Sequence, residues 1–110
     1  MRKVCNIDIR QSERVYKRLN RFVSRLRKSL PVTEVYLYGS FASGEIHEGS
    51  DIDLVIVGDF RGKLFERIEQ VLELTDLPVE PLVYSQEEFR RMRRTNQFLK
   101  EVLRKGKKLL

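Results

Sequence analysis

The chain has 110 residues, a formal net charge of +6, 35% charged residues and 41% apolar residues. This length and apolar fraction suit a single domain over residues 1–110 with a core of its own, and they leave little room for a second domain. A lone cysteine, Cys5, excludes an intramolecular disulfide framework and indicates a reducing, cytoplasmic setting. We expect a soluble protein, because the first residues are charged where a secretory signal is apolar and no apolar run reaches membrane-spanning length.

Charge is unevenly distributed along the chain. The balance of bases over acids is +8 in residues 1–30, −8 in residues 31–84 and +6 in residues 85–110. Basic surfaces attract polyanions, so nucleic-acid binding by the two ends is one interpretation. The dense basic clusters within these segments, residues 25–28 and 90–94, lack interleaved exposed aromatic residues on which bases would stack. We therefore favour a solvated helix face or a surface for an acidic protein partner.

The first predicted element is a helix that follows Ser12 as its N-cap and ends at Pro31. Its apolar residues recur at three- and four-residue steps: Val15, Leu19, Phe22, Val23, Leu26 and Leu30. The basic residues between them are expected to face solvent or a partner. A strand over residues 33–39, rich in β-branched and aromatic residues, ends at a tight turn. A short helical turn from Ser40 and a polar loop come next.

A second strand is predicted over residues 51–58. It is apolar on both faces beyond its first residues, which is typical of a strand inside a covered sheet. A helix from about residue 63 to residue 75 follows. The third predicted strand, residues 79–84, contains Pro81, which cannot donate to a sheet ladder and therefore indicates an edge strand or a bulge.

Two helices complete the predicted order. Ser85 and Glu88 have the spacing of a capping box and open the first of them. The pair Thr95-Asn96 separates it from the last helix, which we expect to end at Gly106. Strands that alternate with helices in this way predict an α/β fold with a small sheet.

Asp51 and Asp53 lie two residues apart at the start of a predicted strand, so their side chains point to the same face. Carboxylates this close repel each other, and a divalent cation relieves the repulsion. Such hard oxygen ligands suit Mg²⁺ or Mn²⁺, which take phosphate oxygens as further ligands. Gly39-Ser40, at the end of the previous strand, offers close backbone approach, a hydroxyl and free N–H groups to a phosphate. The alternative for the two aspartates is a solvated strand end, and the alternative for Gly39-Ser40 is an ordinary turn.

The pattern of Gly39-Ser40, ten further residues and then Asp51-Ile52-Asp53 resembles the minimal nucleotidyltransferases (MNT) of the DNA polymerase β superfamily. The resemblance extends over most of the chain. It implies a polymerase-β-like fold, with a small mixed sheet flanked by helices. It also implies that a third carboxylate on the following strand, Glu80, joins the metal site, although an exposed edge-strand glutamate is the alternative.

The activity that the resemblance implies is metal-dependent transfer of AMP from ATP to a hydroxyl group. In this interpretation the catalytic metal ligands are Asp51, Asp53 and Glu80. The residues around the nucleotide are Gly39, Ser40, Ser43 and Ser50. Two positions depart from the family pattern, because many relatives have aspartate in place of Glu80 and a basic residue in place of Ser43. Tyr36 and Tyr38, on the preceding strand, are expected to be packing residues and not platforms for a base.

The resemblance also implies a partner. Stand-alone domains similar to this one are typically encoded beside a helical HEPN protein and act as antitoxins that adenylylate a tyrosine of the HEPN ribonuclease. One alternative is an MNT-fold module that neutralises its partner by contact, which Glu80 and Ser43 favour. Another is a small basic nucleic-acid-binding domain. A homo-oligomer is also compatible with the sequence.

Overall fold

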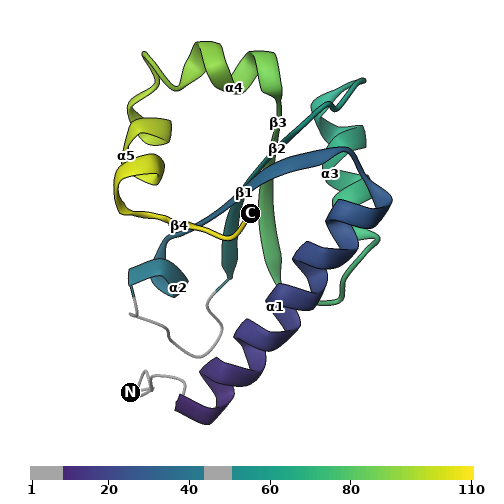
Figure 1. The fold of residues 1–110 in the computed structure, drawn as a ribbon, viewed down its shortest axis with the longest axis vertical. Helices are drawn as coiled ribbons and strands as arrows, with labels where there is room; N and C mark the ends of the chain where they lie inside the picture. Colours follow the sequence, from purple (N-terminus) through teal and green to yellow (C-terminus); the bar gives the residue numbers. More distant parts are fainter. Residues whose placement is uncertain (1–8, 44–50) are drawn as a thin grey trace, which may run out of the picture.

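The computed structural model describes residues 9–43 and 51–110. The elements in chain order are α1 (Ile9–Ser29), β1 (Val32–Tyr38), α2 (Ser40–Ser43), β2 (Ile52–Gly58), α3 (Leu64–Leu72), β3 (Val79–Ser85), α4 (Gln86–Met92), α5 (Gln97–Lys105) and β4 (Lys107–Lys108). No helix in these two ranges has the length and apolar character needed to cross a membrane. The strands form one sheet in the order β3-β2-β1-β4 (Figure 1).

The sheet is mixed. β1 pairs antiparallel with both β2 and β4, whereas β2 pairs parallel with β3. Among the described strands β3 therefore has one neighbour, and the prediction that Pro81 marks an edge strand is confirmed. The expected α/β class and the small mixed sheet flanked by helices are confirmed as well.

The sheet carries a hydrophobic core on each face, because side chains alternate between the two faces along every strand. α1 and α3 supply residues to one core, and α4 and α5 supply residues to the other. The larger core contains Leu19, Phe22, Val23, Leu26, Val35, Leu37, Phe41, Ile52, Leu54, Ile56, Phe60, Val71, Leu77, Val79 and Val83. The smaller core contains Tyr36, Val55, Val57, Phe89, Leu99 and Val102. β2 contributes to both cores, as its apolar sequence predicted.

Two helices differ from the sequence-based expectations by about one turn. α1 already includes Ile9, before the expected N-cap at Ser12, and α3 ends at Leu72, three residues early. The strand β4 was not predicted, because two consecutive lysines carry no strand signal. Gly106 permits this strand, since a Cβ there would lie 2.5 Å from the Val102 carbonyl oxygen and 2.8 Å from the Leu37 carbonyl oxygen.

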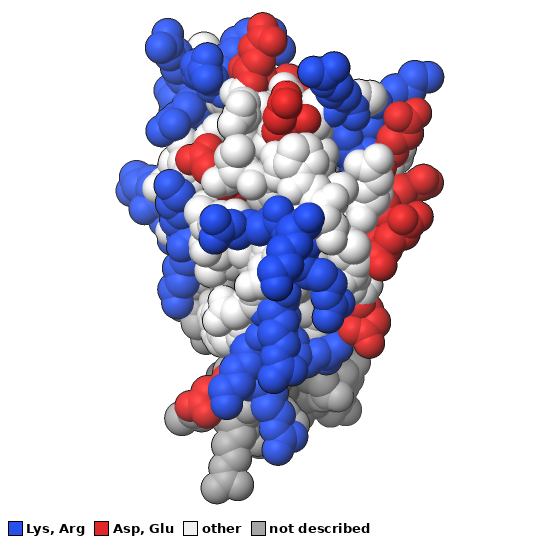
Figure 2. All heavy atoms as spheres, turned by 45° about the vertical axis from the view of Figure 1, so that its right-hand side comes forward, with Lys and Arg blue, Asp and Glu red and all other residues white. Residues whose placement is uncertain are grey.

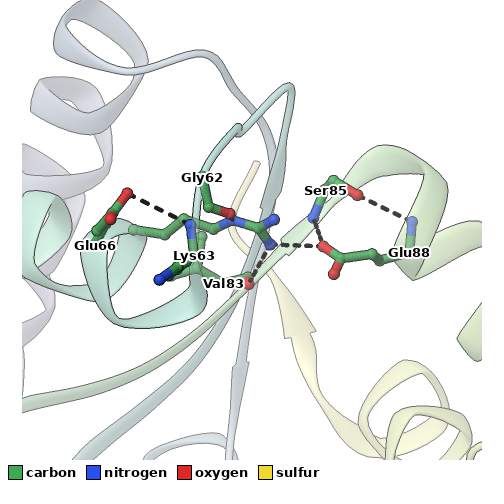
Figure 3. Close-up of polar contacts among 7 residues, drawn as sticks. Gly62, Lys63, Glu66, Val83, Ser85 and Glu88 are labelled. Carbon is green, nitrogen blue, oxygen red and sulfur yellow. Dashed lines mark hydrogen bonds and ion pairs between the residues drawn. The ribbon is translucent and has the colours of Figure 1, made fainter.

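A polar network centred on Arg67 links α3, β3 and α4 (Figure 3). The guanidinium donates to Glu88 Oε1 at 2.6 Å and to the carbonyl oxygens of Gly62 and Val83 at 3.1 and 3.5 Å. Glu88 also accepts from the Ser85 amide at 2.7 Å, and the Ser85 hydroxyl accepts from the Glu88 amide at 3.1 Å. The predicted capping box is thus confirmed, and Arg67 ties it to the neighbouring helix.

Candidate active site

The register of the sheet brings the predicted carboxylates to one edge. Asp53 lies beside Glu80 in the parallel pairing of β2 with β3, and beside Tyr38 in the antiparallel pairing of β1 with β2. Paired residues on neighbouring strands project to the same face. Asp51 lies two residues before Asp53, just ahead of the first residue of β2. Asp53 is half-buried, and Asp51 and Glu80 are exposed.

The three carboxyl groups affect one another electrostatically. Burial raises the pKa of Asp53; a hydrogen bond with Glu80 opposes this shift and the negative charge of Asp51 adds to it. The pKa of Glu80 is also raised, first by a hydrogen bond with Asp51 and then by the charges of Asp51 and Asp53. This edge of the sheet therefore concentrates negative charge that a cation would neutralise.

The donor set at this edge suits a hard divalent cation, because it consists of carboxylate oxygens. Within residues 9–43 and 51–110, however, no three His, Cys, Asp or Glu side chains are grouped in an arrangement that could hold a metal ion. The strand register thus brings Asp51, Asp53 and Glu80 to one edge, where their carboxyl groups interact with one another.

The turn after β1 lies directly against the Asp53 carboxylate. Gly39 has φ +74°, in the left-handed region that favours glycine, and a Cβ at this position would lie 2.3 Å from Asp53 Oδ2. The backbone conformation therefore favours glycine, and any larger residue would have to displace the Asp53 carboxylate. The sequence predicted close backbone approach to a phosphate at Gly39; in the structure Gly39 lies against Asp53, and its approach to a phosphate stays a prediction.

α1 holds the short helix that follows this turn. The Ala42 amide donates to the Gly39 carbonyl oxygen at 3.1 Å, closing the turn. The Tyr16 hydroxyl donates to the Phe41 carbonyl oxygen, and the two rings meet edge-on with centroids 6.3 Å apart. Phe41 is itself buried in the larger core. α2 is thereby fixed between the core and α1, next to the carboxylate edge.

Three predicted nucleotide-binding residues are placed only in part. Ser40 and Ser43 are the first and last residues of α2, and their side chains lie outside what the structure describes. Ser50 lies outside the described residues altogether. Their proposed contacts with a nucleotide stay predictions.

An aromatic pair borders the carboxylate edge. The Tyr38 ring packs edge-on against Phe98 of α5, with centroids 5.1 Å apart, and Phe98 is 40% exposed. Burial raises the pKa of Tyr38 to about 12, and the negative charge of Asp53 adds to this effect. Tyr36 is buried and stacks on Phe89, so the expectation that Tyr36 and Tyr38 pack is confirmed. Sequence reasoning missed Phe98, because an aromatic residue on an amphipathic helix resembles a core residue.

The fold defines an α/β protein with a candidate site at the acidic edge of its sheet. The chemistry of this site suits a phosphate that is bound through a metal ion. Residues 17–109 match the model of the family described as Nucleotidyltransferase domain, and the chain belongs to this family. A comparison with curated proteins gave no match. The resemblance to the minimal nucleotidyltransferases is thus confirmed at the level of family and fold.

Solved structures share this fold. A crystal structure of a candidate nucleotidyltransferase from Sulfolobus solfataricus is 29% identical, with a TM-score of 0.61, and the match covers 73% of this chain and 75% of that one. A toxin–antitoxin complex with AMP-PNP is 21% identical, with a TM-score of 0.56 and coverage of 83% and 72%. A mutant of the MntA–HpeT toxin–antitoxin complex is 19% identical, with a TM-score of 0.53 and coverage of 83% and 70%. The last two show the fold alone.

Proposed function

We propose that this nucleotidyltransferase uses a divalent metal ion, Mg²⁺ or Mn²⁺, to transfer AMP from ATP to a hydroxyl group of a partner protein. The observation that carries the proposal is the pairing of Asp53 with Glu80 while Gly39 lies against the Asp53 carboxylate. This arrangement places carboxylate oxygens next to a turn whose backbone can approach a phosphate closely. A metal-bound triphosphate requires both features.

In the proposed reaction, the acceptor oxygen attacks the α-phosphorus, the bond to the β-phosphate oxygen breaks, and pyrophosphate leaves as the acceptor proton is released. Asp51, Asp53 and Glu80 are the residues that would hold the metal. When bound, the metal would supply positive charge to the phosphate oxygens and favour loss of the acceptor proton. The backbone around Gly39 and Ser40 would hold the phosphate tail, with Ser43 and Ser50 beside it.

The second part of the proposal concerns the molecule that accepts AMP. The solved toxin–antitoxin complexes share the fold, and one of them contains AMP-PNP. These complexes support a toxin as the partner. Together with the resemblance described above, they lead us to propose a helical HEPN-type toxin whose tyrosine hydroxyl receives AMP. The acceptor hydroxyl would then come from the partner and not from this chain.

The proposal is tested by incubating the protein with ATP labelled at the α-phosphate, Mg²⁺ and the product of the neighbouring gene. We expect label on the partner, and we expect Asp53→Asn to reduce labelling by on the order of 100-fold or more, because an electrostatic group at the reacting phosphate is lost. Asp59→Asn is the matched control, because Asp59 is an exposed aspartate just beyond the opposite end of β2. Labelling that persists in Asp53→Asn, or that needs no divalent metal, would contradict the proposal.

A second candidate function is neutralisation of the partner by contact, without transfer. It is favoured by the finding that, among the described residues, no three potential ligand side chains are grouped around a metal position. Inhibition of the partner by Asp53→Asn that matches the inhibition by the unmodified protein, with no label transferred by either, would support this candidate.

A further inference from the structure

We propose that the outer face of α1 binds the phosphate backbone of a nucleic acid. Six exposed cationic side chains lie along this helix, each three or four residues from another member of the set: Arg14, Lys17, Arg18, Arg21, Arg25 and Lys28. Residues spaced in this way lie on one side of a helix. We call them the α1 stripe. Figure 2 shows basic side chains gathered in a band down the middle of one face, with acidic side chains along its right-hand edge.

The length of the α1 stripe matches a run of phosphates. A helix rises 1.5 Å per residue, so the stripe extends over about 21 Å. One strand of duplex DNA presents a phosphate about every 3.4 Å along its axis, so the stripe can face roughly six phosphates. The number of cations is therefore close to the number of phosphate charges within reach.

Part of the α1 stripe is already held in position. Arg18, Arg21 and Arg25 line a groove of about 100 Å³ between α1 and the turn that precedes β3. The Arg18 guanidinium pairs with Asp76 at 2.7 Å, and Arg25 donates to the Leu74 carbonyl oxygen at 2.8 Å. These contacts reduce the side-chain entropy that two arginines would lose on binding. Arginine also suits phosphate, because its planar guanidinium can donate two hydrogen bonds to one phosphate.

The composition of this face favours a nucleic acid over a protein partner. Protein interfaces are centred on buried apolar and aromatic side chains and are depleted of charge at the centre. In the part of the chain that the structure describes, the exposed large apolar side chains are Leu64, Phe65, Leu72 and Phe98, and none of them belongs to α1. A row of cations without an apolar centre instead provides what phosphate binding needs, which is charge neutralisation and counterion release.

The α1 stripe is separate from the carboxylate edge. The buried side of α1 packs into the larger core, on the sheet face to which Ile52 and Leu54 project. Asp53 projects to the opposite face, because it alternates with these two residues along β2. Nucleic-acid binding by α1 would therefore be a second activity, independent of the metal and the nucleotide.

The test measures fluorescence anisotropy of labelled 20-nucleotide RNA and DNA, each single-stranded and double-stranded, over 50–200 mM salt. For six phosphate contacts we expect affinity to fall about 10³-fold across this range. The variant with Lys17→Gln, Arg21→Gln and Lys28→Gln keeps good helix formers at exposed positions of α1. It should lower the magnitude of the slope of log affinity against log salt by about 2–3 for a duplex. The RNA and DNA arms identify which nucleic acid is bound more tightly.

A matched control removes the same charge elsewhere. The variant with Arg90→Gln, Arg91→Gln and Arg94→Gln neutralises three exposed arginines of another basic patch, on α4 and the turn after it. We expect it to retain most of the affinity and of the salt slope. An equal loss in both variants, no binding to any of the four nucleic acids at 50 mM salt, or competition by polyglutamate as strong as by RNA of equal charge would each overturn the proposal. Thermal unfolding of both variants shows that each is folded.

Discussion

Gly39 and Asp53 show how far single residues could be interpreted from the sequence. The spacing between the Gly-Ser pair and the two aspartates predicted one site in which the glycine turn binds a phosphate and the carboxylates bind a metal. The structure has a positive φ at Gly39 and too little space for a Cβ beside Asp53 Oδ2. Glu80 was predicted from the resemblance, and the strand register places it beside Asp53. Phe98 could not be predicted, because its contact with Tyr38 depends on how α5 crosses the sheet.

Replacement of Gly39 should separate the effect on the site from the effect on the fold. In Gly39→Ala the left-handed backbone costs about 1–2 kcal/mol, and the new methyl group also displaces the Asp53 carboxylate. We expect transfer of labelled AMP to fall by on the order of 100-fold, because displacement of a positioning group by about 1 Å has effects of this size. The measurement is the initial rate of labelling at a temperature where the variant is fully folded.

Gly62→Ala is the control for this substitution. Gly62 also has a positive φ, +88°, but a Cβ there would meet Glu66 Oε2, at the end of a flexible side chain far from the carboxylate edge. We expect a similar loss in the free energy of unfolding, with little change in the rate of labelling. Equal labelling rates in the two variants would show that contact between Gly39 and Asp53 has no role in the reaction.

At the scale of elements, local signals were predictable and long-range partners were not. Ser85 and Glu88 were identified as a capping box because both partners lie within four residues of each other. The ion pair of Glu88 with Arg67 joins residues 21 positions apart, and no sequence spacing indicates it. β4 is a similar case, since its pairing is set by the free edge of β1 and not by its own residues.

The capping box of α4 leads to a pH-dependent prediction. The pKa of Glu88 is lowered from its ordinary value of 4.5, first by the hydrogen bond from the Ser85 amide and also by Arg67. The ionised carboxylate therefore stabilises the fold above about pH 4.5, and this contribution is lost as the pH falls through the lowered pKa. Glu88→Gln should cost about 1 kcal/mol at pH 7, a modest value because the Glu88 side chain is 36% exposed.

Urea denaturation of the unmodified protein and of Glu88→Gln between pH 3 and 7 checks this prediction. The difference between their free energies of unfolding should narrow as the pH falls, because glutamate becomes protonated and glutamine does not titrate. Glu87→Gln is the matched control, since Glu87 is an exposed neighbour in the same first turn of α4. A difference for Glu88→Gln that stays constant with pH would show that the charge of Glu88 is not what stabilises the cap.

For the whole molecule, the apolar alternation of β2 predicted a sheet covered on both faces, but it did not indicate which helices cover which face. The direction in which each connection crosses the sheet decides this assignment. The helices on the two faces bury different numbers of apolar side chains. α1 buries Leu19, Phe22, Val23 and Leu26, whereas α5 buries Leu99 and Val102. The thinner layer covers the sheet face to which Asp53 projects. The element that borders the candidate site is therefore the less strongly packed one.

This inequality predicts a difference in local stability that amide hydrogen exchange can measure. The two additional apolar side chains that α1 buries contribute about 3–6 kcal/mol, so α5 should open at least about 100-fold more often than α1. Peptides from α5 should exchange faster than peptides from residues 19–26, and Leu99→Ala should accelerate exchange in α4 and α5 while leaving α1 unchanged. If all these peptides exchange at one rate and Leu99→Ala accelerates them equally, the two layers unfold as one unit. In the expected case, the sheet face of the carboxylate edge is uncovered without unfolding α1, which would give the acceptor in the proposed reaction a route to Asp53 while the α1 stripe stays in place.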